Sequence, residues 1–223
     1  TLAGEIEAKL RTSLAQSLAD LRLEHVDLFF LHSNLAPDGY NHPGETNPLR
    51  APTPWRSYCE IVRPLLNDLI DEGLIGAWGL SAIGVPSTLL KAFNDEPAPQ
   101  AAQCITNPLD SAGALRMFDE PARPRELIQA AKKNGIGVLG IRAVQAGALT
   151  SAFDRYIPHQ NADMADYRRA TPFRALAKEL GVSPADLAHR YALSMEGVDT
   201  VVLGIKNRTE LEACLAVEQA GPL

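Results

Sequence analysis

Residues 26–33, VDLFFLHS, predict a β-strand that is apolar on both faces and ends abruptly in an imidazole. Strands of this kind are typical of parallel sheets. Barrel and doubly wound proteins carry their chemistry at the carboxyl ends of such strands. His32 is therefore a candidate functional residue, because an imidazole can donate or accept a hydrogen bond and can exchange a proton with a substrate. Taken alone, a histidine at this place more often closes a strand as a satisfied, half-buried side chain.

Composition excludes several classes of protein. The chain has 223 residues, 46% of them hydrophobic and 22% charged, which suffices for one sizeable core. We therefore expect a single domain over residues 1–223. The net charge of −6, with no basic stripe, argues against a nucleic-acid partner. The widely spaced Cys59, Cys104 and Cys214 indicate a reduced, cytoplasmic protein rather than a disulfide framework or a metal site. No apolar run reaches transmembrane length, so we expect no membrane partner.

Predicted strands and helices alternate along the chain. Further strands are expected at 76–81, 101–106, 136–141 and 200–204, and helices at 2–21, 55–72 with a kink at Pro64, 87–93, 123–133, 172–180, from Ser183 onward and 208–220. Two stretches without periodicity, 33–54 and 143–170, are expected to set specificity. The alternation predicts an α/β fold. The absence of G-x-G-x-x-G after the first strand favours a (β/α)8 TIM barrel over a doubly wound sheet.

Each predicted strand delivers polar groups at its far end. These are His32, Ser81, Gln103 with Asn107, Arg142 with Gln145, and the segment from Gly204 to Arg208. The last segment joins a strand, a glycine and the cations Lys206 and Arg208 to a helix start, which predicts a phosphate seat. An ordinary capped helix with solvated cations fits the same spacing equally well.

Taken together, these segments resemble the aldo-keto reductases, NAD(P)H-dependent carbonyl reductases built on a (β/α)8 barrel. The resemblance covers most of the chain. It rests on the strand ending in His32, on Gly79-Leu80-Ser81, on Gln103 to Asn107, on residues 135–138 with Gly147-Ala148-Leu149-Thr150, and on residues 201–214. A small carbonyl compound is the substrate that this family implies.

The resemblance implies a role for each matching residue. His32 would orient or protonate the substrate carbonyl. The cofactor, NADP(H) with NAD(H) as the alternative, would be held by Ser81, Gln103, Arg142, Leu203, Gly204, Lys206, Arg208, Glu210 and Cys214. Ser81 and Gln103 would bond the nicotinamide carboxamide, and Gly204, Lys206 and Arg208 the phosphates.

Several positions depart from the family pattern. Ala82 stands where the family usually has asparagine, and Ile141 where an aromatic ring often stacks on the nicotinamide. Cys214 replaces the usual adenine-binding asparagine. Glu210 stands where arginine or glutamine is usual, and its charge would repel a 2′-phosphate.

Part of the family's catalytic set has no counterpart in this sequence. The Asp, Tyr and Lys come from the first three βα units, whereas about five units are found here and a full barrel needs about 250 residues. We expect a barrel domain truncated at its N-terminus, with those residues upstream of Thr1, and a chain that is inactive by itself.

Two other functions fit the sequence. A catalytically impaired, cofactor-binding regulatory subunit of the same fold would explain the altered nicotinamide contacts. An unrelated barrel enzyme with a phosphorylated substrate would use only the seat at residues 204–208. The residues that precede Thr1 would separate the first of these from a working reductase.

Overall fold

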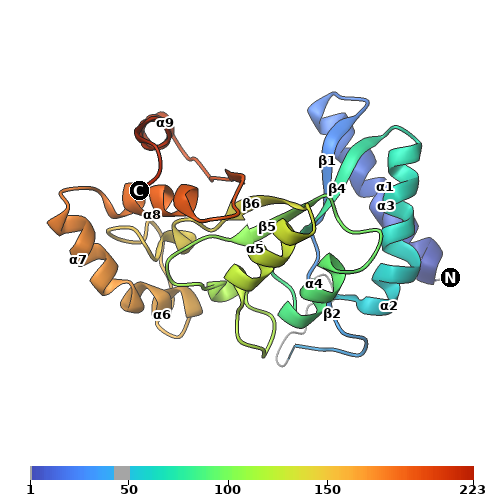
Figure 1. The fold of residues 1–223 in the computed structure, drawn as a ribbon, viewed down its shortest axis with the longest axis horizontal. Helices are drawn as coiled ribbons and strands as arrows, with labels where there is room; N and C mark the ends of the chain where they lie inside the picture. Colours follow the sequence, from blue (N-terminus) through green and yellow to red (C-terminus); the bar gives the residue numbers. More distant parts are fainter. Residues whose placement is uncertain (1, 43–50) are drawn as a thin grey trace. The chain divides into compact units, whose positions relative to one another are not determined.

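The computed structural model describes residues 2–42 and 51–223 (Figure 1). The chain folds into two compact units. The first unit contains the described residues up to Ala102, together with Met117–Glu120 and Lys133–Ile136. The second contains Gln103–Arg116, Pro121–Lys132 and Gly137–Leu223. Whether residues 1–223 act as one domain stays a prediction.

A pair of parallel strands forms the centre of the first unit. β1 (Val26–Leu31) lies beside β4 (Ile75–Ser81), with Leu31 opposite Leu80. Helix α1 (Leu2–Leu21) runs near α3 (Arg63–Asp71), and Arg11 of α1 bonds both carboxylate oxygens of Glu72 at 2.7 and 2.8 Å (Figure 1). α4 (Pro86–Phe93) follows β4. This strand–helix order confirms the expected α/β pattern.

The predicted helix 55–72 is continuous but changes its winding. α2 (Trp55–Ser57) passes into a π-helical turn, Tyr58–Val62, and then into α3. Pro64 stands at the start of α3 and has no N–H to donate to the preceding turn, so the irregularity falls just before it instead of as a kink within the helix. The turn buries Tyr58 completely against Trp78.

The stretch 33–54 is not wholly irregular. β2 (Leu35–Ala36) and β3 (Thr53–Pro54) pair in parallel, with Leu35 opposite Thr53. Residues 43–50 lie outside the described part of the chain.

The second unit continues the alternation. β5 (Ala101–Ile105) begins in the first unit and ends in the second, where β5, β6 (Gly137–Ile141) and β7 (Thr200–Val201) follow in that order. β7 is parallel to β6, with Val201 opposite Gly140. The unit's helices are α5 (Pro124–Lys133), α6 (Ala162–Arg169), α7 (Thr171–Glu179), α8 (Pro184–Ser194) and α9 (Arg208–Ala220). Short 3-10 turns lie at Gly113–Leu115 and Gln145–Gly147.

Two sequence expectations are wrong here. The last strand was expected to reach residue 204 but ends at Val201, because β6 itself ends at Ile141 and offers Val202 only one further bond, at 2.8 Å to the Gly140 carbonyl. The stretch 143–170 was expected to be irregular, yet it contains α6. That helix has no apolar face, because aspartates occupy its buried side.

The α/β class and the parallel pairing are confirmed, while closure of the strands into a barrel stays a prediction. Within residues 2–42 and 51–223, no helix has the length and apolar character needed to cross a membrane.

Gly140 provides a test of strand packing in the second unit. A Cβ at this position would lie 2.7 Å from Oγ1 and 2.9 Å from Cγ2 of Thr106. We expect Gly140→Ala to lower the free energy of unfolding by about 1–3 kcal/mol, as overpacking does. In a Thr106→Ala background the same change should cost clearly less, as measured by denaturant unfolding of all four proteins of the cycle. Equal costs in both backgrounds would contradict this packing.

Candidate functional site

In the first unit, His32 and Ser81 lie at neighbouring strand ends. His32 is the first residue after β1, and Ser81 is the last residue of β4. Because Leu31 lies opposite Leu80 in the parallel pair, the two polar residues follow at the same edge. His32 is exposed, whereas Ser81 is buried and already engaged with other groups. The sequence analysis predicted that these two residues lie at the same edge. The exposed imidazole of His32 is accessible to a ligand there.

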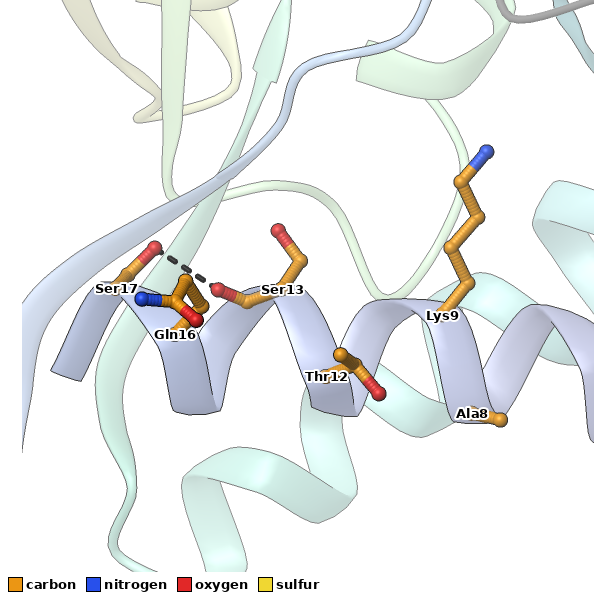
Figure 2. A pocket seen from close by; sticks show the side chains of 6 residues that line it. All are labelled: Ala8, Lys9, Thr12, Ser13, Gln16 and Ser17. Atoms are coloured by element: carbon orange, nitrogen blue, oxygen red, sulfur yellow. Dashed lines mark hydrogen bonds between the residues drawn. The ribbon is translucent and has the colours of Figure 1, made fainter. Parts of the chain in front are cut away.

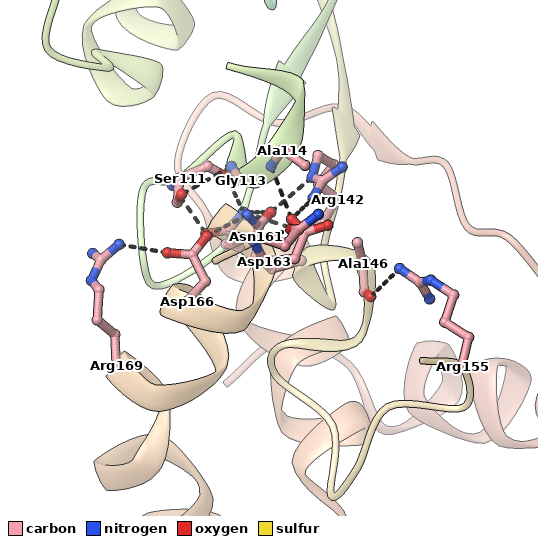
Figure 3. Close-up of polar contacts among 12 residues, drawn as sticks. Ser111, Gly113, Ala114, Arg142, Ala146, Arg155, Asn161, Asp163, Asp166 and Arg169 are labelled. Carbon is pink, nitrogen blue, oxygen red and sulfur yellow. Dashed lines mark hydrogen bonds and ion pairs between the residues drawn. The ribbon is translucent and has the colours of Figure 1, made fainter. Parts of the chain in front are cut away.

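In the second unit, Arg142 follows β6 but does not extend into solvent. Its Nε donates to Gln145 Oε1 at 2.8 Å, and its Nη2 pairs with Asp163 Oδ1 at 2.9 Å (Figure 3). Only 13% of the Arg142 side chain and 8% of the Asp163 side chain are exposed. Burial lowers the pKa of Arg142, and the Asp163 carboxylate opposes that shift. The guanidinium proposed from the sequence as a cofactor ligand is thus held by protein groups.

Residues 142–147 form a turn that we call the β6 turn. Arg142, Gln145 and Ala146 have φ values of 58°, 47° and 51°, in the left-handed region that disfavours residues with a Cβ. Each such residue costs about 1–3 kcal/mol and persists only where the surroundings impose it. Gln145 is fully buried, and its Nε2 donates to Asp166 Oδ2 at 2.6 Å.

Asn107, two residues after the end of β5, adds further bonds to the β6 turn. Its Nδ2 donates to Gln145 Oε1 at 3.1 Å and to the Arg142 carbonyl at 3.3 Å. The side chain is completely buried. The last residue of the segment that resembles the family therefore serves the β6 turn in this structure.

The start of α9 is a capped helix with its cations engaged. Asn207 accepts a bond from the Glu210 N–H at 2.9 Å, and Glu210 accepts one from the Lys206 N–H at 2.9 Å. Lys206 Nζ pairs with Asp154 and lies 3.7 Å from Glu210. Arg208 is 90% exposed and lies 3.4 Å from Glu212. The structure thus has the capped helix start with two exposed cations, and binding of a phosphate at this segment stays a prediction.

Asp154 and Arg155 connect the β6 turn with the start of α9. Arg155 donates to the Ala146 carbonyl at 2.9 Å and to Asp154 at 3.1 Å, while Asp154 pairs with Lys206. The hydrogen bond to Lys206 lowers the pKa of Asp154, and the same bond raises the pKa of Lys206. Arg142 and Lys206, far apart in sequence, thereby belong to one chain of contacts.

The remaining predicted residues are not joined to that chain by the bonds described. Leu203 is half-buried and Gly204 is exposed beyond β7, with open space where a Cβ would stand. Gln103 lies within β5 and is engaged with other groups. Cys214 lies on α9, with Sγ 3.9 Å from Nδ1 of His189, and burial raises the pKa of its thiol.

Sequence reasoning missed four charged residues that shape this region. Asp154 and Arg155 lie in a stretch without periodicity, and Asp163 and Asp166 lie on the unexpected helix α6. Their i, i+3 spacing would have placed both aspartates on one face, had the helix been recognised. The start signal was present, because Asn161 caps α6 by accepting the Asp163 N–H at 2.8 Å.

A hollow of about 560 Å³ borders α1 (Figure 2). Its lining holds small and polar side chains, none of them predicted from the sequence to be functional: Ala8, Lys9, Thr12, Ser13, Gln16 and Ser17. Within the described residues, no group of three His, Cys, Asp or Glu side chains is placed to hold a metal ion.

A family model for the aldo/keto reductase family matches residues 3–223. The chain belongs to this family. Similar solved structures include those of the aldo-keto reductase AKR11C1 from Bacillus halodurans in its holo and apo forms, each with a TM-score of 0.63 and 19% sequence identity. The two alignments cover 97% of this chain, and 63% and 64% of the other chains. At this identity the likeness concerns the fold alone, and this family member spans less than two thirds of their length.

The Asp154–Lys206 pair gives a testable titration. We expect Lys206→Met to raise the pKa of Asp154 towards its ordinary value, because the hydrogen bond that lowers it is lost. In the unaltered protein the pair stabilises the fold at pH values above the ordinary pKa of an aspartate. This stabilisation is lost as the pH falls through the lowered pKa of Asp154. Carbon-detected NMR of the Asp154 carboxylate measures its pKa in both proteins. The matched control is Lys178→Met, the same change at another exposed lysine. An unchanged Asp154 titration in Lys206→Met would refute the pairing.

Proposed function

We propose that the protein is an NAD(P)H-dependent oxidoreductase that reduces an aldehyde or ketone to an alcohol. The family match over residues 3–223 carries this proposal. When bound, the nicotinamide would supply the hydride. The roles below concern what this chain's own residues would do.

His32 would act on the substrate oxygen. An imidazole N–H can donate a hydrogen bond to a carbonyl or pass a proton to the developing alkoxide. Its exposure at the end of β1 fits that role, because a substrate must reach it. Ser81, its buried neighbour at the end of β4, would bond the nicotinamide carboxamide.

The start of α9 offers two cations to a cofactor phosphate, although these cations must exchange their present carboxylate partners. Lys206 and Arg208 are exposed and stand at the positive end of a 13-residue helix. Asp154, Glu210 and Glu212 balance them in this structure. Such exposed pairs are weak, so a phosphate group could replace a carboxylate as the partner of either cation. Glu210 would oppose a 2′-phosphate, and the preference for NADP(H) over NAD(H) therefore depends on Lys206 and Arg208.

The proposal is tested on the full-length protein with NADPH and a panel of aldehydes. We expect aldehyde-dependent NADPH oxidation, and His32→Ala should lower kcat by about 10²–10⁴-fold, the range for a lost acid–base group. The matched control is His159→Ala, since His159 is exposed and, within residues 2–42 and 51–223, only its backbone carbonyl is seen to accept a bond. Equal activity of the two variants would remove His32 from the mechanism. NADPH binding without turnover of any carbonyl would indicate a cofactor-binding subunit instead.

Cofactor choice is tested separately. Lys206→Ala should raise the dissociation constant of NADPH about 10-fold or more, because a charge-assisted bond contributes about 1.5–3 kcal/mol. The dissociation constant of NADH should rise less, because NADH lacks the 2′-phosphate. Tryptophan fluorescence quenching measures both, with Lys178→Ala as the control. An equal rise for the two cofactors would place Lys206 away from the 2′-phosphate.

A further inference from the structure

Two buried carboxylates of α6 point at the β6 turn. Asp163 and Asp166 are 6% and 3% exposed, and they lie three residues apart on one face of the helix. Asp163 accepts bonds from Arg142 at 2.9 Å and from the Ala114 N–H at 3.0 Å (Figure 3). Asp166 accepts bonds from Gln145 at 2.6 Å and from Arg169 at 2.7 Å. Two of the three non-glycine left-handed residues of the turn are therefore held through their side chains by one helix.

The third left-handed residue is held through its backbone. Ala146 has no polar side chain, and its carbonyl accepts a bond from Arg155 at 2.9 Å. Neighbouring space is equally restricted, because a Cβ at Gly113 would overlap the Asp163 carboxylate and lie 2.5 Å from Gln145 Nε2. The turn, the segment around Gly113 and the start of α6 thus fix one another.

Stability alone is a poor reason for this arrangement. Buried ion pairs usually contribute no more than well-packed apolar side chains would, because both charges must leave water. What such a pair can supply is one defined conformation in place of several. Strained backbone that its surroundings hold in place is concentrated at functional sites. The β6 turn also lies beyond the carboxyl end of a parallel strand, where α/β proteins build their sites.

We propose that Asp163 and Asp166 are positioning residues for the cofactor: through Arg142 and Gln145 they hold the β6 turn in its left-handed form before the cofactor binds. Arg142 then serves the turn and does not itself bind a phosphate. The inference rests on the proposed function, since it assigns to that cofactor site the element that forms it in advance. A site that is formed only part of the time binds more weakly in proportion to the fraction that is formed.

The test uses the full-length protein and NADPH. Asp163→Asn is expected to raise the dissociation constant of NADPH about 10-fold, as if a tenth of the molecules had the turn formed. The kcat at saturating NADPH should stay within about twofold, because bound cofactor selects the formed turn. Adding Ala146→Gly should restore much of the affinity, since glycine adopts positive φ without the steric cost. A merely structural role for Asp163 predicts no such rescue of affinity.

The matched control is Asp95→Asn in the first unit. It breaks an ion pair of similar length, Arg63–Asp95 at 2.8 Å, whose arginine is 12% exposed and whose aspartate is 44% exposed. We expect it to lower Tm without changing the dissociation constant. If Asp163→Asn changes only Tm, or if Ala146→Gly leaves the affinity low, the inference is wrong while the proposed function stands. Failure of the unaltered protein to bind NADPH overturns both.

If Asp163→Asn does not fold, hydrogen exchange in the unaltered protein tests the inference instead. In the unaltered protein without NADPH, the amides of Gln145 and Gly147 should be protected, because they donate to the Arg142 and Val144 carbonyls at 2.8 and 3.0 Å. Exchange at the rate of an unstructured chain, slowed only when NADPH is added, would show that the cofactor forms the turn and would overturn the inference.

Discussion

The second unit depends on one costly contact, the buried pairing of Arg142 with Asp163. The chain leaves β6 through a turn with three non-glycine residues at positive φ, a conformation that local preferences oppose. Side chains from elsewhere must therefore impose it, and the carboxylates of α6 do so with Asn107 as a third buried anchor. Removing one partner would leave the other charge buried and unpaired. The network is therefore favourable only when all of its members are present.

The start of α9 shows the opposite balance. Its ion pairs are exposed to water, which screens them, so each cation can change its partner with little loss of free energy. Glu210 has two opposing effects: as part of the cap it stabilises the helix start, and as an anion it weakens the field that would attract a phosphate. A ligand that binds here gains only the difference between its own contacts and those that the carboxylates already make.

The sequence predicted the elements that leave a signal in a short stretch of residues. The strand that ends at His32, the helix–strand alternation and the capped start of α9 all leave local signals, and the structure has each of them. Helix α6 was missed because its buried face carries Asp163 and Asp166, so the apolar stripe that marks a helix is absent. The role of Arg142 could not be read for a related reason. Its partner stands 21 positions away, on an element that the pattern did not show.

Asp154 and Arg155 connect the β6 turn, which the buried Arg142–Asp163 pair holds, to the exposed ion pairs at the start of α9. This connection decides which contacts a ligand can break. Arg155 bonds the strained Ala146 carbonyl on one side and Asp154 on the other, and Asp154 reaches Lys206. A ligand that displaces Asp154 from Lys206 breaks only contacts that solvent already weakens. The same displacement leaves Arg142, Gln145 and their aspartates untouched, because none of those bonds runs through Asp154. If a phosphate binds at Lys206 as proposed, we therefore expect rearrangement in the loop before α6 and at the start of α9, and we expect the β6 turn to keep the geometry that the buried carboxylates give it.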